Sequence, residues 1–202
     1  ILKGEFEKRG ITFALSARVT AIEKNGVRYE QDGESKFIEA YKVLLSIGRR
    51  ANTQGLGLES IGVYTNRGAV VTDSSMQTNQ PGVYAAGDVN GVSMLAHTAY
   101  REAEVAVNNI LGKKDIMRYE AIPAVLYTNP ELASVGETEA TASAKGLPYK
   151  TVQLPMKFAG RYQAENEGGR GIMKLLVHQH TNRALGMHVI ANYASEFILA
   201  AV

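Results

Sequence analysis

The residues best placed to do chemistry lie in the stretch from Thr78 to His97. Within it, Gly87 and Asp88 follow a short apolar run, Val83 to Ala86, and this pattern is typical of a β-strand that ends in a sharp turn. Ligands of open α/β sheets bind at the carboxyl ends of strands, where a carboxylate can accept hydrogen bonds from sugar-type hydroxyl groups. The pattern predicts a ligand site at Asp88, although an ordinary strand–turn–helix unit has the same spacing.

A helix is expected to begin directly after this turn. Ser93 is the expected N-cap, small and apolar residues recur at helical spacing from Leu95 onward, and Gly112 ends the pattern. The first backbone N–H groups would be free and would carry the positive end of the helix dipole, about half a charge. These groups belong to Met94, Leu95, Ala96 and His97. We expect them to stabilise an anionic or electron-rich ring edge.

The composition of the chain narrows the classes of function. Its 202 residues carry a formal net charge of +2 and include 45% apolar residues, which is ordinary for a soluble globular protein. A charge this small does not indicate a nucleic-acid or membrane-surface partner, and no apolar run is long enough to span a bilayer. The absence of cysteine excludes disulfides, thiol nucleophiles and thiolate metal sites in this chain. We expect a cytoplasmic protein that binds neither nucleic acid nor membranes.

The N-terminal region is expected to combine one helix with short strands. A charged helix should run from Leu2 and end at Gly10, and a strand should follow over Ile11–Leu15. Short β-rich runs then alternate with turn signals, which predicts an antiparallel meander over residues 18–39. The turn signals are Asn25-Gly26 and Asp32-Gly33.

A continuous apolar run over Val43–Ile47 predicts a strand that is buried on both faces. Gly48 stands at its carboxyl end, where a missing side chain could let a cofactor approach. Arg49 or Arg50 could then meet a phosphate or a carboxylate. The alternative interpretation, a turn followed by two solvated arginines, fits the pattern equally well.

The region after residue 116 alternates strands and turns, and is expected to be a separate α+β domain. Thr138 is the expected cap of a helix over Glu139–Ala144. Short turns between sequential strands favour an antiparallel sheet with helices on one side. The expected strands are Ala124–Tyr127, Leu132–Gly136, Tyr149–Leu154, Ile172–Val177 and Ala184–Ile190.

No nucleophile–base pair and no metal-ligand set is predicted in this region. His178 and His180 lie two apart on an expected strand and so point the same way. Because no third ligand is in view, we expect a solvated or packed pair rather than a metal site.

Both ends of the sequence suggest a longer protein. The chain begins at Ile1 without an initiator methionine and stops in an apolar run, Phe197 to Val202, that has no polar cap behind it. We expect both ends to be cuts within a larger chain. The alternative is a native terminal helix, which more often frays out through polar residues.

Several segments, taken in order, resemble those of one family. Thr78 to Val89 resembles the second flavin-binding motif of the pyridine nucleotide-disulfide oxidoreductases. Other matching segments are Ile47–Arg50 with Asn52-Thr53, Met94–His97, Tyr127–Glu131, Val135–Glu139 and Ala194–Glu196. Ordered motifs across nearly the whole chain are far more specific than any one of them. Met94–His97, together with Phe158-Ala159, Arg161 and Ala164, resembles the branch that oxidises dihydrolipoamide more than the glutathione or mercuric reductases.

The resemblance implies a fold that is α/β plus α+β. Residues 1–48 would be the second half of a Rossmann-like NAD-binding domain, and residues 49–115 the returning part of a Rossmann-like FAD-binding domain. Residues 116–202 would be most of an antiparallel-sheet interface domain, which pairs two subunits into a homodimer. The parent protein could also associate with 2-oxo acid dehydrogenase complexes.

The resemblance also implies roles for particular residues. Asp88, with Gly87, would bind the ribityl or phosphate side of FAD, and the backbone of Met94–His97 would meet the pyrimidine edge of the flavin. Val19 would pack near the adenine of NAD, and Gly48 would lie along the path of the nicotinamide.

Other parts of the family pattern are missing from the sequence. It contains neither the GxGxxG fingerprints, nor the CxxxxC redox pair, nor the His-Pro-x-x-x-x-Glu dyad. The parent would pass electrons from dihydrolipoamide through a disulfide and FAD to NAD, whereas this chain alone would be inactive, would lack catalytic residues and would not retain FAD. Two alternatives remain open: another disulfide reductase of the family, or a non-catalytic module that self-associates.

Overall fold

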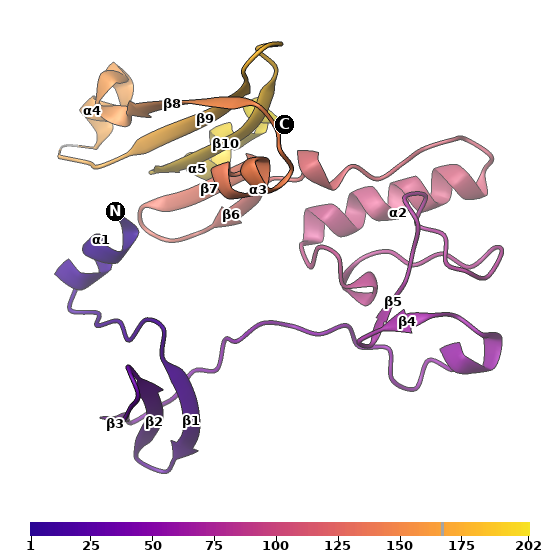
Figure 1. The fold of residues 1–202 in the computed structure, drawn as a ribbon, viewed down its shortest axis with the longest axis horizontal. Coiled ribbons are helices and arrows are strands. Elements are labelled where there is room, and N and C mark those ends of the chain that lie inside the picture. Colours follow the sequence, from indigo (N-terminus) through magenta and orange to yellow (C-terminus); the bar gives the residue numbers. More distant parts are fainter. Residues whose placement is uncertain (167) are drawn as a thin grey trace. The chain divides into compact units, whose positions relative to one another are not determined.

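The computed structural model describes residues 1–166 and 168–202. The chain divides into two compact units, Ile1–Gly48 and Arg49–Val202 (Figure 1). Each unit is described by itself below. None of the described helices is long and apolar enough to cross a membrane.

The first unit begins with the expected short helix, α1 (Leu2–Lys8). Gly10 follows in a left-handed conformation, φ +82°, and its N–H donates to the carbonyl of Glu7. The expected end of the helix at Gly10 is therefore confirmed. The strand expected over Ile11–Leu15 is wrong, because this segment has no strand partner among the described residues and its side chains are exposed.

The predicted meander is confirmed as a three-stranded antiparallel sheet in the order β1-β2-β3. Its strands are β1 (Arg18–Glu23), β2 (Gly26–Gln31) and β3 (Glu34–Glu39). Asp32 and Gly33 both have positive φ, +54° and +81°, in the tight turn between β2 and β3. Two positive φ values are the mark of a type I′ turn, whose twist matches that of the strands.

The first hairpin differs in register from the expected Asn25-Gly26 turn. Glu23 pairs with Gly26, so the two turn residues are Lys24 and Asn25, and Gly26 already belongs to β2. A Cβ atom at Gly26 would lie 2.2 Å from the carbonyl oxygen of Ile38. The glycine is needed for this close approach of strands rather than for turn geometry.

The buried strand expected over Val43–Ile47 is also wrong. This segment forms no ladder with any described residue, and Leu44 and Ile47 are 91% and 86% exposed. An apolar run forms a strand only when neighbouring strands satisfy its backbone hydrogen bonds. The sequence pattern is that of a buried strand, but the first unit supplies no partner for it.

The second unit begins with short elements that lead to one long helix. The short elements are η1 (Leu58–Ile61), β4 (Thr65–Asn66), β5 (Ala69–Val70) and η2 (Asp88–Asn90), and the long helix is α2 (Ala96–Ile110). The strand expected over Val83–Ala86 is reduced to a single antiparallel bridge between Tyr84 and Gln77. A small core of Met76, Val105, Ala106 and Met117 joins this part to α2.

The sequence predicted the end of helix α2 correctly but not its start. Its N-cap is Leu95, which makes no side-chain cap, so the expected cap at Ser93 is wrong. The Ser93 hydroxyl instead shares a hydrogen bond of 2.9 Å with the hydroxyl of Thr98. At the other end Gly112 adopts φ +76° and its N–H donates to the carbonyl of Asn109, which confirms the predicted end.

The C-terminal part of this unit is a five-stranded antiparallel sheet in the order β6-β7-β10-β9-β8 (Figure 1). The expected strands are confirmed to within a residue at each end. The strands are β6 (Ala124–Leu126), β7 (Glu131–Gly136), β8 (Tyr149–Pro155), β9 (Ile172–His178) and β10 (Ala184–Ala191). Its helical elements are η3 (Tyr119–Ala121), α3 (Glu139–Ala144), η4 (Met156–Phe158), α4 (Gly160–Glu165), α5 (Ala194–Phe197) and η5 (Ile198–Ala201).

The core of this sheet follows from strand alternation. Ala133 and Val135 on β7 and Val189 and Ala191 on β10 are buried on one face, where residues two apart point the same way. Tyr162, Ala194 and Ile198 join the same cluster. Thr138 caps α3 as expected, because its hydroxyl accepts the N–H of Thr141 at 3.1 Å.

Candidate functional site

The centre of the candidate site is the turn at Gly87 and Asp88. Gly87 is buried and adopts φ +85° and ψ −160°, a region that only glycine visits readily. Asp88 opens the short helix η2, and 50% of its side chain is exposed. The backbone of the turn is therefore held inside the unit, while the carboxylate is available to a ligand.

Helix α2 supports this turn from one side. A Cβ atom at Gly87 would lie 3.3 Å from the Cβ of Ala99, so the two backbones are close to contact. The N–H of Gly87 also donates to Oε2 of Glu102 at 2.5 Å. The Asp88 turn consequently lies against the first two turns of α2.

The first residues of α2 carry the expected unpaired backbone groups. No side chain of the described residues caps the helix, Met94 and Leu95 are half-buried, and Ala96 and His97 are exposed. The His97 imidazole is occupied elsewhere, since its Nε2 lies 2.7 Å from the carbonyl oxygen of Pro123. The backbone of Met94–His97, rather than the histidine ring, is what this helix start offers to a ligand.

The structure brings Asp88 and the start of α2 to one corner of the second unit, as the sequence predicts. Val19 and Gly48 belong to the first unit: Val19 is exposed on β1, and Gly48 has φ +111° at the end of the unit. Their roles in NAD binding stay predictions.

Glu102 is a site residue that sequence reasoning missed. It is 0% exposed, and its two carboxylate oxygens accept hydrogen bonds from Gly87 N–H and from the hydroxyl of Tyr119, the second at 2.7 Å. A glutamate that shares a helix face with Thr98 and Val105, both buried, is the signal that could have revealed it.

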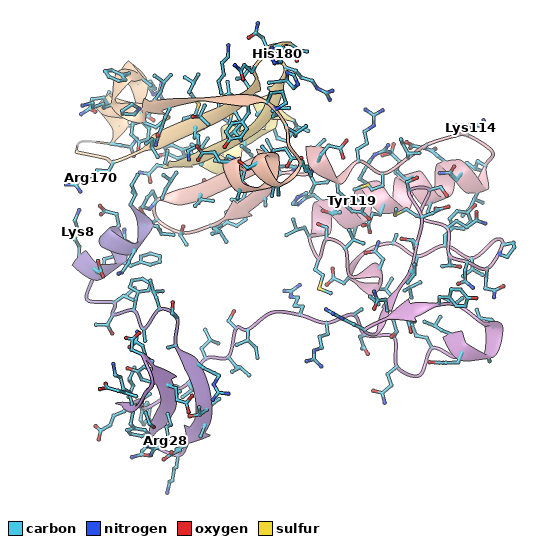
Figure 2. The ribbon with its side chains drawn as sticks, viewed as in Figure 1. Lys8, Arg28, Lys114, Tyr119, Arg170 and His180 are labelled. Atoms are coloured by element: carbon cyan, nitrogen blue, oxygen red, sulfur yellow. The ribbon has the colours of Figure 1, made fainter. Side chains whose placement is uncertain are left out.

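Tyr119 approaches this helix from η3, and Figure 2 shows it beside α2. Burial raises the pKa of the Tyr119 hydroxyl well above its usual range, and the hydrogen bond to the Glu102 carboxylate raises the pKa further. The hydroxyl therefore stays protonated and serves as a permanent donor to Glu102.

A basic pocket lies next to the Asp88 turn. Its volume is about 780 Å³, within the usual range for ligand sites. Arg49, Arg50 and Arg67 contribute its positive charge, and Asn90 and Met94 line the wall shared with the turn and α2. A ligand that carries negative charge would be attracted to this corner.

Arg49 forms a loose ion pair within its own chain, and the two alternatives left open by the sequence remain open. Its guanidinium Nη1 lies 3.7 Å from Oδ2 of Asp88, so it meets a carboxylate of its own chain. The two side chains are 73% and 50% exposed, and an ion pair of this kind is screened by water and contributes little to stability. The pair can open to admit a ligand at small cost.

Helix α2 is fixed to the segment that follows it by a second ion pair. Arg101 donates two hydrogen bonds to Asp115, of 2.6 and 2.8 Å, and Asn108 donates a third of 2.9 Å. The hydrogen bond from Arg101, with that from Asn108, lowers the pKa of Asp115 to about 2. Asp115 is thus ionised at neutral pH and holds the loop after α2.

Among the described residues no group of three or more His, Cys, Asp or Glu side chains could hold a metal ion. The ring Nδ1 of His178 accepts the backbone N–H groups of His180 and Thr181, each at 3.3 Å. This histidine therefore supports the turn between β9 and β10.

The Gly87–Asp88 turn, the uncapped helix start and the antiparallel C-terminal sheet agree with the nucleotide-binding and interface domains that the resemblance implies. Family models support this interpretation: residues 1–103 match "pyridine nucleotide-disulphide oxidoreductase", and residues 122–202 match the dimerisation domain of the same family. The chain belongs to the pyridine nucleotide-disulphide oxidoreductase family. The resemblance inferred from the ordered motifs is confirmed.

Curated relatives point to one branch of the family. A dihydrolipoyl dehydrogenase from Chlamydia muridarum is 40% identical over 96% of this chain and 42% of the relative. A mitochondrial dihydrolipoyl dehydrogenase from Pisum sativum is 37% identical over 95% of this chain and 40% of the relative. The leghemoglobin reductase of Glycine max is also 37% identical, over 95% of this chain and 38% of the relative. The chain spans about two fifths of the length of these relatives.

Solved structures share the fold. LpdA from Mycobacterium tuberculosis superposes with a TM-score of 0.82 at 32% identity, over 98% of this chain and 44% of that one. RclA from Escherichia coli, described as an HOCl-induced flavoprotein disulfide reductase, has a TM-score of 0.83 at 26% identity, over 98% and 46%. These neighbours and the two family matches confirm the predicted fold class, α/β plus α+β.

Proposed function

We propose that the Gly87–Asp88 turn and the start of α2 bind the ribityl and pyrimidine end of FAD in a dihydrolipoamide dehydrogenase. The observation that carries this proposal is the exposed carboxylate of Asp88 beside an uncapped helix N-terminus, on a turn whose backbone is buried. The names of the relatives supply the reaction class.

The residues present fit this part of FAD on chemical grounds. A carboxylate accepts hydrogen bonds from the hydroxyl groups of a ribityl chain, and such charge-assisted bonds are about twice as strong as neutral ones. Ala85, Ala86 and Gly87 leave the approach to Asp88 open because their side chains are small or absent. The free N–H groups of Met94–His97 suit the electron-rich pyrimidine edge of a flavin.

In the complete enzyme these residues bind and orient, and none of them transfers a proton. When bound, FAD would accept electrons from the redox disulfide once the substrate dithiol has reduced it, and would pass them to NAD as hydride. Asp88 holds the ribityl chain, and the α2 dipole stabilises negative charge at the pyrimidine edge. Val19 packs near the adenine of NAD, and Gly48 leaves room for the nicotinamide.

We propose domain roles that follow from the same assignment. Residues 1–48 belong to the NAD-binding domain, residues 49–115 to the FAD-binding domain, and residues 116–202 to the interface domain of a homodimer. The match of residues 122–202 to a dimerisation domain supports the last role. The complete protein would associate with 2-oxo acid dehydrogenase complexes, whereas the 202-residue chain alone is inactive and releases FAD.

The test is an Asp88→Ala substitution in the complete protein. Each hydrogen bond to a charged group contributes about 1.5–3 kcal/mol, so the dissociation constant of FAD should rise by roughly 10- to 150-fold per bond lost. Flavin absorbance of the purified protein and titration of the apoprotein with FAD measure the effect. Asp32→Asn is the control, because it removes a carboxylate in the tight turn between β2 and β3, where asparagine tolerates positive φ. FAD occupancy that is unchanged in Asp88→Ala would refute the assigned role.

A second candidate within the family is a different disulfide reductase. The similarity to RclA, a flavoprotein disulfide reductase, favours keeping this candidate. Assays of the complete protein with lipoamide, glutathione and mercuric ion distinguish the two. Turnover of lipoamide well above the others supports the first assignment, and the reverse order supports the second.

A further inference from the structure

We infer that Glu102 is a positioning residue for the Gly87–Asp88 turn, and that Tyr119 holds Glu102 in place. This inference rests on the proposed function, because the turn is the one assigned to FAD. The segment that enters the C-terminal sheet would thereby set how Asp88 is presented to the flavin.

The first step is the burial of Glu102. A carboxylate that is fully removed from water is costly unless its oxygens accept hydrogen bonds. Glu102 is 0% exposed and uses both oxygens, Oε2 toward the N–H of Gly87 at 2.5 Å and Oε1 toward the hydroxyl of Tyr119 at 2.7 Å. Each donor therefore compensates part of the cost of burying the charge.

The second step is the effect on the turn. Gly87 lacks a side chain and can adopt many backbone conformations, so its own sterics do not select φ +85° and ψ −160°. The hydrogen bond from its N–H to Glu102 fixes the Ala86–Gly87 peptide, which is where the chain enters the turn. The direction of the Asp88 carboxylate consequently depends on where Glu102 is held.

The third step is the segment that holds Glu102. Residues 117–123 are joined by several contacts to residues on both sides of the turn. Met117 N–H donates to the carbonyl of Ser74 at 2.8 Å, and the Pro123 carbonyl lies 2.7 Å from Nε2 of His97. Between them in sequence, the Tyr119 hydroxyl donates to Glu102 and lies 3.9 Å from the sulfur of Met76. Displacement of this segment would therefore move both the Glu102 side chain and the first turn of α2.

The experiment uses the complete protein and three substitutions in the proposed chain of contacts. Tyr119→Phe removes one donor and keeps the ring. Glu102→Ala removes both acceptors. Glu102→Gln is the conservative variant, because its amide oxygen can still accept Gly87 N–H while its NH₂ group donates to the oxygen of Tyr119.

Two matched controls lie on the same helix. Glu104→Gln changes an exposed carboxylate whose partner is Arg101, and Tyr100→Phe changes a tyrosine that is 79% exposed. No hydrogen bond or ion pair among the described residues joins either side chain to the turn. Both controls should keep wild-type FAD affinity and the wild-type spectrum of bound flavin.

We expect the dissociation constant of FAD to rise about tenfold in Tyr119→Phe and about a hundredfold in Glu102→Ala. Glu102→Gln should remain within roughly threefold of wild type, because it preserves both contacts. The visible circular dichroism of the bound flavin should change in Tyr119→Phe, since the carboxylate that faces the ribityl chain shifts. A general loss of stability would lower occupancy without altering the signal of each flavin that stays bound.

Asp88→Ala, measured in the same series, separates the two proposals. If Asp88→Ala loses FAD while Tyr119→Phe matches wild type in affinity and flavin dichroism, and Glu102→Ala does so or fails to fold, the positioning role is overturned and the flavin site stands. If Asp88→Ala binds FAD like wild type, the flavin site itself is overturned, and the positioning role with it. If Glu102→Ala fails to fold, Tyr119→Phe still decides, because Glu102→Gln is expected to match wild type in either case.

Discussion

Replacement of Gly87 by alanine tests the geometry on which the candidate site depends. Gly87 has φ +85° and ψ −160°, and a residue with a Cβ atom held in that region costs about 1–3 kcal/mol. The added Cβ would also lie 3.3 Å from the Cβ of Ala99, so that contact must give by a few tenths of an ångström. The expected total is about 2–3 kcal/mol, or roughly 30- to 150-fold in an equilibrium constant.

The free-energy cost of the substitution can lower either the stability of the apoprotein or its affinity for FAD. Both quantities should be measured in the complete protein. If the strained turn persists, the apoprotein unfolds at lower temperature and FAD binding changes little. If the turn relaxes, Asp88 moves and the dissociation constant of FAD rises by about the full factor. Thermal unfolding of the apoprotein and flavin titration together account for the whole cost.

Gly82→Ala is the matched control for this experiment. Gly82 also has positive φ, +77°, but an added Cβ there would have no atom within 4 Å. Its substitution should cost about 1 kcal/mol of backbone strain and should leave FAD affinity unchanged. The reasoning is refuted if Gly87→Ala matches wild type in both unfolding temperature and FAD affinity, or if it is no worse than Gly82→Ala.

Three further predictions concern the second unit, each measured by chemical denaturation of the 202-residue chain. Leu176→Ala should lower the free energy of unfolding by about 2–5 kcal/mol, because Leu176 is fully buried on β9, and a loss below 1 kcal/mol would contradict its place in the core. Thr138→Ala should cost about 0.5–2 kcal/mol through loss of the α3 cap, whereas Thr138→Ser should restore most of it. The pKa of Asp115 is lowered from 3.8 to about 2 in the folded chain, so its stabilising contribution is present above about pH 4 and disappears as the pH falls toward 2. Asp115→Asn should therefore be less stable than wild type at neutral pH, and this difference should shrink over that range; a difference that is the same at pH 6 and pH 2 would show that Asp115 is not held by Arg101.

The C-terminal sheet could be predicted from sequence because its signals are local. Glu139–Ala144 carries its own cap at Thr138, and the strands are bounded by turns that fix where pairing stops. Alternation along β7 and β10 then decides which side chains are buried. None of these inferences needed knowledge of distant residues.

Prediction failed where a segment depends on a partner from elsewhere in the fold. Val43–Ile47 and Ile11–Leu15 have apolar strand patterns, yet no described strand pairs with either. Ser93 is a good N-cap residue, but its hydroxyl is bonded to Thr98 while the helix starts at Leu95. Propensity describes what a residue can do, and tertiary contacts decide which option is realised.

The candidate site also contains a part that could be predicted from sequence and a part that could not. Asp88 and the start of α2 are close in sequence, so their proximity follows from one turn and one helix. Helical spacing could place Glu102 on the same face as Thr98 and Val105, but its partners Gly87 and Tyr119 lie 15 and 17 positions away, and no sequence pattern pairs them with it. The supporting part of the site was therefore visible only in three dimensions.

The order of the five-stranded sheet has a consequence for how the chain is made. β6 and β7 form one local pair, and β8, β9 and β10 form another local group, but the two groups join only through the pairing of β7 with β10. A ribosome that adds about 5–20 residues per second needs roughly 2–10 s to travel from the end of β7 to the start of β10. During that interval the backbone groups on one edge of β7 are unpaired and can bind other nascent chains or chaperones. Binding to this partly formed sheet would affect the yield of folded protein.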